Sequence, residues 1–430
     1  MTPVHATETP TRARYWVIVF AVTLAILSYI DRVSISQAAP LVMRDLHLSK
    51  EQMGYVFGAF ALAYAIFEVP SGWLGDRLGA RGVLLRIVLW WSGFKALSGW
   101  MFSFIPMVTV RFLFGAGEAG CFPNLTKAFA TWLPHGERTR AQGILWTFAR
   151  WGGAFTPPLV VLFLSWMNWR WAFTVFGILG VAWAVLFARW YRNNPADHPS
   201  VNAAELALIH HGASQASTHA HVPWTKIVRS RSVLLLWVQY FCLTYPWYFY
   251  ITWLPTWLQE RHHLSESASA NYSVLPLLLG GTGALLCGFL LAPLARHIGG
   301  VARARRIVAA SAFVGASVLM ALCSQLNSPP LAMIVMGLAS FCNDLVMPPS
   351  WTACMDIGGR FAGTVSGSMN MVGNLAGFVA PVAGGYILHL THGNWNIFLY
   401  SMAAVYLCGA FCWPFIDPVT PLELHPTEPD

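Results

Sequence analysis

The chain has 430 residues, of which 56% are hydrophobic and only 10% are Asp, Glu, Lys or Arg. Soluble domains carry about a quarter charged residues, so this composition excludes water as the only solvent. The formal net charge of +8 comes from cations spread over many predicted loops rather than gathered on one face, which argues against a nucleic-acid-binding protein.

Apolar stretches of about 20 residues, the length that crosses a bilayer core, recur from the N-terminus to the C-terminus. The first stretch is longer than a signal-peptide h-region and contains Asp31 and Arg32 near its end, so it is predicted to be a membrane helix. Twelve helices are predicted, at residues 15–40, 53–74, 83–104, 106–128, 141–165, 170–191, 232–258, 270–294, 305–325, 331–354, 361–388 and 395–416.

A polar segment divides these helices into two groups of six. The predicted organisation is a tail at 1–14, a bundle at 15–191, a linker at 192–231, a bundle at 232–416 and a tail at 417–430. Most Lys and Arg residues of the predicted loops fall on one side of the membrane, which by the positive-inside rule places both termini in the cytoplasm. The fold class is therefore an all-α membrane protein with two pseudo-symmetric six-helix bundles.

Sites of covalent or metal chemistry are not predicted. The eight cysteines do not pair by spacing and suit small apolar filler, and the His pairs have no matching ligands. No Ser/His/Asp cluster and no nucleotide motif in a suitable context is found. We therefore expect no cofactor, no metal and no enzymatic activity.

Charged side chains inside the predicted spans are the main functional signal. A charge at the centre of a membrane helix costs about 2.5–3.5 kcal/mol, so these residues must face the bundle interior, water or one another. They are Asp31, Arg32, Glu68, Lys95, Arg111, Glu118, Arg150 and Asp344. Because most of them fall in the first half of the chain, that half is expected to carry the ionic chemistry.

Arg111 and Glu118 form the sharpest pair. Seven residues are close to two helical turns, so both side chains project from one face, about 10 Å apart. They could bracket a substrate carboxylate or share it with the first helix. There, Asp31 beside Arg32 offers a protonatable carboxylate next to a cation, and an anion that captured Arg32 would release Asp31 to take a proton. The alternative is a permanent ion pair that locks the first helix to the fourth.

Other intramembrane charges leave alternatives open. Arg150 could contact substrate or pair with Glu68 or Glu118, and Lys95 could snorkel or pair. Glu68 and Asp344 suit gate or packing elements better than a proton site.

Uncharged polar residues characterise the second half. Tyr245 and Tyr248 flank Pro246, and Asn370 and Asn374 stand four residues apart on one helix face. Such side chains can contact the hydroxyls and C–H surface of a sugar, or they can join neighbouring helices.

These residues carry a resemblance to a known family. The pattern Gly72-x-x-x-Asp76-Arg77-x-Gly79-x-Arg81 resembles the signature between helices 2 and 3 of the major facilitator superfamily. The combination of Asp31-Arg32, Tyr64 and Arg111 with Glu118, and the run Trp253–Leu258, resemble its anion:cation symporter branch. That branch includes bacterial hexuronate, glucarate and galactonate carriers.

The resemblance implies proton-coupled import of an organic anion, with a sugar acid the best guess. It implies that Arg32, Arg111 and Tyr64 bind substrate, with Asn370 and Asn374 at its hydroxyls, and that Asp31 and Glu118 carry protons. Tyr245 completes the predicted substrate site.

In the same family, Asp76 and the basic residues after it clamp the cytoplasmic side. The corresponding turn of the second half, residues 292–300, lacks an acidic residue. We therefore expect the clamp to be one-sided. Lys95 matches no part of the pattern.

A multi-pass protein of a bacterial-type inner membrane follows, with a small anion, protons and the lipid bilayer as partners, and a monomeric state is expected. Two other functions stay open. The first is a uniporter or a drug/proton antiporter, although the fifth helix lacks the Gly-Pro-x-x-Gly-Gly run of an antiporter. The second is a membrane enzyme or a non-transporting sensor.

Overall fold

The computed structural model describes residues 9–48, 50–210 and 224–422, which form helices joined by short turns and no strand. The first half packs six membrane-length segments. These are α1 (Tyr15–Leu46), α2 (Lys50–Leu78), α3 (Ala80–Ser98), α4 (Phe104–Glu118) with α5 (Cys121–Trp132), α6 (His135–Trp166) and α7 (Trp169–Trp190).

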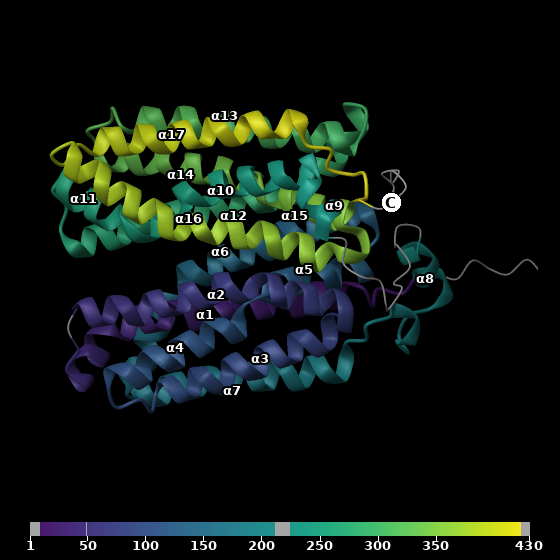
Figure 1. The fold of residues 1–430 in the computed structure, drawn as a ribbon, viewed down its shortest axis with the longest axis horizontal. Helices are drawn as coiled ribbons and strands as arrows, with labels where there is room; N and C mark the ends of the chain where they lie inside the picture. Colours follow the sequence, from purple (N-terminus) through teal and green to yellow (C-terminus); the bar gives the residue numbers. More distant parts are fainter. Residues whose placement is uncertain (1–8, 49, 211–223, 423–430) are drawn as a thin grey trace, which may run out of the picture.

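The second half repeats this arrangement. It contains α10 (Arg231–Thr252) with α11 (Leu254–His262), α12 (Glu266–His297), α13 (Val301–Cys323), α14 (Pro329–Leu345) with α15 (Met347–Gly358), α16 (Ala362–Leu390) and α17 (Trp395–Cys412), and the short helices η2 (Gly359–Phe361) and η3 (Trp413–Phe415). In Figure 1 the two halves lie one above the other, and α5, α6 and α15 lie where they meet. The main contacts between the halves join α6 to α12 and α2 to α16.

Eight stretches of the described chain are apolar and long enough to cross a membrane, and one of them, residues 329–380, covers two of the predicted spans. The long helices α3, α6 and α10 fall outside this set, and α3 and α6 carry several charged residues. Large apolar side chains such as Phe378, Leu390 and Phe411 are more than 70% exposed. An apolar surface of this kind suits lipid as the surrounding solvent.

The break between α4 and α5 positions part of the functional site. Ala119 leaves the helical conformation, and Gly120 follows with φ +83°. A Cβ atom on Gly120 would lie 2.2 Å from the Cβ of Ser71, so only glycine allows α2 to pass this closely. The break leaves the N–H of Gly120 free to donate to Glu68 Oε2 at 3.1 Å.

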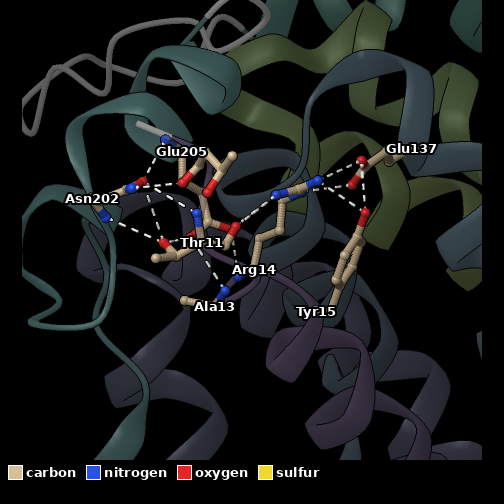
Figure 2. Close-up of polar contacts among 8 residues, drawn as sticks. Thr11, Ala13, Arg14, Tyr15, Glu137, Asn202 and Glu205 are labelled. Atoms are coloured by element: carbon tan, nitrogen blue, oxygen red, sulfur yellow. Dashed lines mark hydrogen bonds and ion pairs between the residues drawn. The ribbon is translucent and has the colours of Figure 1, made fainter. Parts of the chain in front are cut away.

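The first part of the linker between the halves docks on the first half. It contains η1 (Pro195–Asp197), α8 (Ala203–His210) and α9 (Trp224–Arg229). Figure 2 shows Glu205 of α8 accepting hydrogen bonds from the backbone N–H groups of Ala13 and Arg14, both at 3.2 Å. These N–H groups precede α1 and have no partner within it. Glu205 therefore caps the helix that carries Asp31 and Arg32.

Arg14 extends this network to α6. Its Nη1 lies 3.0 Å from Glu205 Oε1, and its Nε lies 2.9 Å from Glu137 Oε2 (Figure 2). The hydrogen bond to Glu137 raises the pKa of the Arg14 guanidinium above its usual value, and Glu205 adds to that shift. At the same end, the segment after α17 is held by the α13 arginines Arg305 and Arg306, whose side chains donate to the carbonyls of Pro418 and Ile416. We call this end of the molecule, which carries both described chain ends, the termini end.

Candidate functional site

A buried cluster of charges lies inside the first half, on α1, α3 and α4. Glu118 has no exposed surface, and Arg32 Nε donates to its Oε1 at 2.7 Å. Ser28, one turn earlier on α1, donates to the same oxygen at 2.5 Å. The other oxygen, Oε2, is buried without a hydrogen-bond partner. Because an unpaired buried carboxylate oxygen is costly, Glu118 Oε2 can accept a further hydrogen-bond donor.

Arg32 lies in an aromatic cage. Its guanidinium carbon is 4.5 Å from the centroid of the Tyr64 ring and between 5.5 and 5.8 Å from the rings of Phe60, Phe122 and Tyr29. About 23% of its side chain remains exposed, so it is the accessible partner of the Glu118 pair. The Tyr64 hydroxyl is buried without a partner. Stacked rings hold the cation while leaving hydrogen-bonding groups for a ligand.

Arg111 lies beside this pair and forms no ion pair with the residues that the structure describes. Its Nε and Nη1 atoms are buried without hydrogen-bond partners, and its guanidinium carbon lies 5.1 Å and 4.8 Å from the rings of Phe60 and Phe114. A Cβ on Gly115 would lie 2.4 Å from the Phe60 carbonyl, so this glycine lets α2 and α4 pack closely around the arginine. A buried guanidinium with unpaired N–H groups can donate charge-assisted hydrogen bonds to an anion.

Asp31 faces the opposite side of α1, toward α3. Lys95 Nζ lies 3.9 Å from Asp31 Oδ1 and donates to the Asp31 carbonyl at 3.1 Å. Asp31 also lies within electrostatic range of Arg111 and Glu118. The structure thus brings Asp31, Arg32, Arg111 and Glu118 together, and it adds Lys95, for which the sequence had left the role open.

Glu68 joins this cluster to the second half. Asn370 of α16 donates to its Oε1 at 2.6 Å, and the N–H of Gly120 binds its other oxygen. Asn374 donates to the Asn370 carbonyl at 2.9 Å and accepts from the Tyr248 hydroxyl at 3.1 Å. Both asparagines therefore lie in a polar path that begins beside Arg32 and leads into α10.

Tyr245 is not brought to this path. It lies beside Ser401 of α17 and 6.3 Å from the Phe241 ring, on another face of α10. Tyr248, three residues later, lies within electrostatic range of Arg32 and Glu68. Three residues turn a helix by about 300°, which leaves the two side chains only about 60° apart. The sequence pattern carries no signal for which of the two turns toward the path.

Arg150 forms an ion pair between the halves. Its Nε and Nη2 atoms bind the two oxygens of Asp344 on α14 at 2.8 and 3.1 Å, and its guanidinium carbon lies 3.2 Å from the centroid of Trp247. The pairing with Glu68 or Glu118 that the sequence left open is therefore replaced by a partner about 190 residues away. No sequence pattern indicated this pairing, because the two residues are far apart in the chain. The gate or packing role predicted for Asp344 stays a prediction.

The motif at residues 72–81 holds the halves together at the termini end. Asp76 accepts from the N–H groups of Gly363 and Thr364 at 3.0 and 2.6 Å and from the Thr364 hydroxyl at 2.6 Å, and it pairs with Lys127 at 3.3 Å. A Cβ on Gly72 would lie 2.5 Å from the Gly363 carbonyl, so this glycine allows α2 and α16 to cross here.

The rest of the motif acts within the first half. Gly79 has φ +82° and leaves room for the Asn193 side chain, which accepts from the N–H of Arg81. The Arg81 guanidinium donates to the carbonyl of Ala188 at the end of α7. Arg77 lies 5.5 Å from the Trp73 ring. These residues fix the α2–α3 turn against α7 and the linker, and Asp76 then reaches across to α16.

The residues 21–381 match the model of the Major Facilitator Superfamily. The chain belongs to this superfamily. It is 34% identical to the probable sulfoacetate transporter SauU of Cupriavidus necator, over 96% of each chain. It is 29% identical to the probable galactarate/D-glucarate transporter GudP of Escherichia coli, over 90% of each, and 27% identical to the hexuronate transporter of Bacillus subtilis, over 94% of each.

Solved structures agree with this fold. The Escherichia coli fucose:proton symporter FucP matches with a TM-score of 0.72 at 15% identity, covering 94% of this chain and 99% of FucP. The human organic anion transporter MFSD10 matches with a TM-score of 0.71 at 16% identity, covering 94% and 100%. The predicted family and fold class are confirmed. Because the relatives are named as transporters, the expectation that this superfamily member is not an enzyme is confirmed as well.

The second half of this superfamily member contributes a buried carboxylate that joins the two halves. Asp356, at the end of α15, accepts from Arg138 of α6 at 3.0 Å and from Arg305 of α13 at 2.8 Å, and His135 lies 2.9 Å from the same carboxylate. The expectation of a one-sided clamp was wrong. The acidic residue is missing from the basic turn at 292–300, but Asp356 supplies it from a neighbouring helix, which a search for a linear repeat could not detect.

Proposed function

We propose that the chain is a proton-coupled symporter that imports a small organic acid by alternating access. The observation that carries this proposal is the buried cluster of Arg32, Glu118 and Arg111. It contains one guanidinium without an ion-pair partner, and a second one held by a carboxylate that has a free oxygen. Such a cluster can exchange an internal anion, Glu118, for an external one.

Competition between the substrate and Glu118 would couple binding to proton uptake. An incoming carboxylate or sulfonate that binds Arg111 and then Arg32 displaces Glu118 from Arg32. The displaced carboxylate is fully buried and loses its counter-ion, so it takes a proton. Release of the anion restores the Arg32–Glu118 pair and expels the proton. One substrate and at least one proton therefore move together.

Locks between the halves would provide the alternating access. Asp76 and Asp356 hold the termini end closed, and the Arg150–Asp344 pair closes the region near the middle of the helices. Substrate reaching Glu118 acts on Glu68 and Asn370 through Tyr64 and Arg32, which lie in one connected set of contacts. We place the termini end in the cytoplasm of a bacterial-type inner membrane, because the Lys and Arg excess lies there.

The relatives support an acid as substrate, since they are named as carriers of sulfoacetate, galactarate, glucarate and hexuronates. We propose a sugar acid or a sulfonated carboxylate, carried by a monomer whose two bundles rock around the site. In this proposal, Asn370 and Asn374 contact substrate hydroxyls from the second half.

Uptake into proteoliposomes under an inward proton gradient tests this function. The protein should accumulate an organic acid, and an ionophore that collapses the gradient should abolish the accumulation. Uptake that ignored the ionophore would refute the coupling.

Glu118→Gln sharpens the same test. The amide can still accept from Arg32 and Ser28 but cannot carry a proton, so counterflow exchange of substrate should persist while proton-driven accumulation is lost. Glu260→Gln, on α11 outside the cluster, is the matched control. Normal accumulation by the Glu118 variant would remove this residue from the proton path.

A further inference from the structure

Lys95, like its neighbour Asp31, is a charge in the cluster that the proposed transport cycle does not use. Its side chain has no exposed surface, and its ammonium donates to Ser34 Oγ at 2.5 Å and to the carbonyl of Asp31 at 3.1 Å. It also lies 4.0 Å from the centroid of the Phe173 ring on α7. Two of its polar contacts are therefore to groups that do not titrate, so the ammonium remains beside Asp31 whatever happens to the carboxylate.

The charges facing Asp31 come from three helices. Arg32 follows it on α1, Lys95 faces it from α3, and Arg111 and Glu118 act on it from α4. Of these, Lys95 is the cation that forms an ion pair with it, at 3.9 Å. Without this ammonium, Asp31 would be a buried carboxylate without its ion-pair partner, within electrostatic range of Arg111, and it would compete with the substrate for that guanidinium.

The two arginines share one aromatic ring. The guanidinium carbons of Arg32 and Arg111 lie 5.5 Å and 5.1 Å from the centroid of Phe60. Their separation is therefore no greater than the sum of these distances, which a short molecule with an anionic group at each end can span. Arg111 is already free of ion pairs, and Arg32 becomes free when Glu118 takes a proton.

We propose that Lys95 is the dedicated counter-ion of Asp31 and that this pairing keeps Arg111 available, so that Arg111 and Arg32 together bind a substrate with two anionic groups. This inference rests on the proposed function and names its substrate class: a short dianion, such as an aldarate or a carboxylate that also carries a sulfonate. It also assigns the coupling proton to Glu118 alone, because the Asp31–Lys95 pair is already neutral.

Matched anions of one carbon skeleton test the substrate class by binding. Glucarate and gluconate share six carbons and differ in carrying two carboxylates or one. Calorimetry on the purified wild-type protein should show glucarate binding at least about tenfold more tightly, because the second carboxylate gains a charge-assisted hydrogen bond to arginine. Sulfoacetate against acetate should give the same order. A wild-type protein that binds the monoanion equally well or better overturns the proposal.

Lys95→Met should reduce the dianion preference to about one, since Asp31 would then occupy one guanidinium. This single variant leaves a buried carboxylate unpaired and can fail to fold. The double variant Asp31→Asn/Lys95→Met removes both charges and restores neutrality. It should recover folding, measured as Tm, together with the dianion preference that the single variant loses. A double variant that folds without recovering the preference would show that Lys95 acts on the substrate directly, which overturns the counter-ion role.

Proton-driven accumulation by the double variant tests whether Glu118 alone carries the coupling proton. Glu118 is intact in it, so accumulation should continue, and its loss would show that Asp31 carries the proton. These outcomes are separate from the proposed function. If the wild-type protein accumulates no acid under a proton gradient, symport fails, while the ratio of the binding constants still decides the role of Lys95.

Discussion

The two six-helix halves use their buried charges in different ways. In the first half, Glu118, Arg32, Asp31 and Lys95 pair with one another inside one bundle, and Arg111 has no ion-pair partner. In the second half, the buried charged side chains of the described chain are Arg305, Asp344 and Asp356, and both carboxylates bind arginines of the first half.

In the proposed cycle, this difference assigns binding and gating to two different sets of charges. Charges that pair within one bundle keep their geometry when the bundle moves as a rigid body, so they can hold a substrate throughout a transport cycle. Charges that pair across the interface must break when the halves rock, so they determine which side is closed. In the proposed cycle, the second half contributes ion pairs that close the molecule and uncharged polar contacts, and the first half contributes the anion site.

Breaking the Arg150–Asp344 pair between the halves is expected to have the largest effect, which is on stability. Arg150→Met leaves Asp344 buried and unpaired, which costs about 3–5 kcal/mol and should lower Tm strongly. The double variant Arg150→Met/Asp344→Leu removes both charges and should recover most of the stability. Equal Tm values for the single variant and the wild-type protein would show that Asp344 is not a buried charge that depends on Arg150.

Removing the unpaired cation tests the binding role. Arg111→Ala should weaken binding of an organic acid by about 100-fold or more, because the anion loses its one guanidinium without a competitor. Arg111→Lys keeps the charge but loses the planar fork, so its affinity should be intermediate. Arg140→Ala, at a cation that lies over Phe289 outside the cluster, is the control. Calorimetric titration measures all three, and unchanged affinity in Arg111→Ala would place the site elsewhere.

Weakening the contacts of the motif at residues 72–81 should shift the equilibrium toward the state that is open at the termini end. Asp76→Asn weakens the contacts to Gly363 and Thr364 and the pair with Lys127, so the population open at the termini end should rise about tenfold. Spin labels at Leu78 and Val301, exposed positions on opposite halves, report this as longer distances. The control Asp45→Asn removes a carboxylate that binds Trp169 within one half. Unchanged distances in the Asp76 variant would contradict its locking role.

The smallest expected effect is at the linker. Glu205→Gln weakens the pair with Arg14 and the cap on α1, at a cost of about 1–2 kcal/mol. The linker should then be cut several-fold faster by protease. Asp197→Asn, an exposed residue of the same linker, should leave the cleavage rate unchanged. Equal rates for both variants would show that Glu205 does not hold the linker on the first half.

Particular residues show which parts of the structure could be predicted from the sequence. The twelve predicted helices correspond to the membrane-length segments, but three of these segments are broken, between α4 and α5, α10 and α11, and α14 and α15. The spacing of Arg111 and Glu118 placed both on one face of the fourth segment. The separation of Arg150 from Asp344 concealed their pairing, and Tyr245 was chosen over Tyr248 without information on how α10 is rotated.

The sequence by itself determined that the helices lie in a lipid bilayer and that they divide into two halves. It also showed that some helices carry charges that lipid cannot surround. These properties follow from local composition and helical periodicity, which need no knowledge of neighbouring helices. The tertiary structure decided which charges meet: Glu118 with Arg32, Lys95 with Asp31, and Asp356 with Arg138 and Arg305. Pairing depends on helix rotation and on close approach at Gly115 and Gly120, because electrostatic interactions act over a few ångströms between residues that are far apart in the chain.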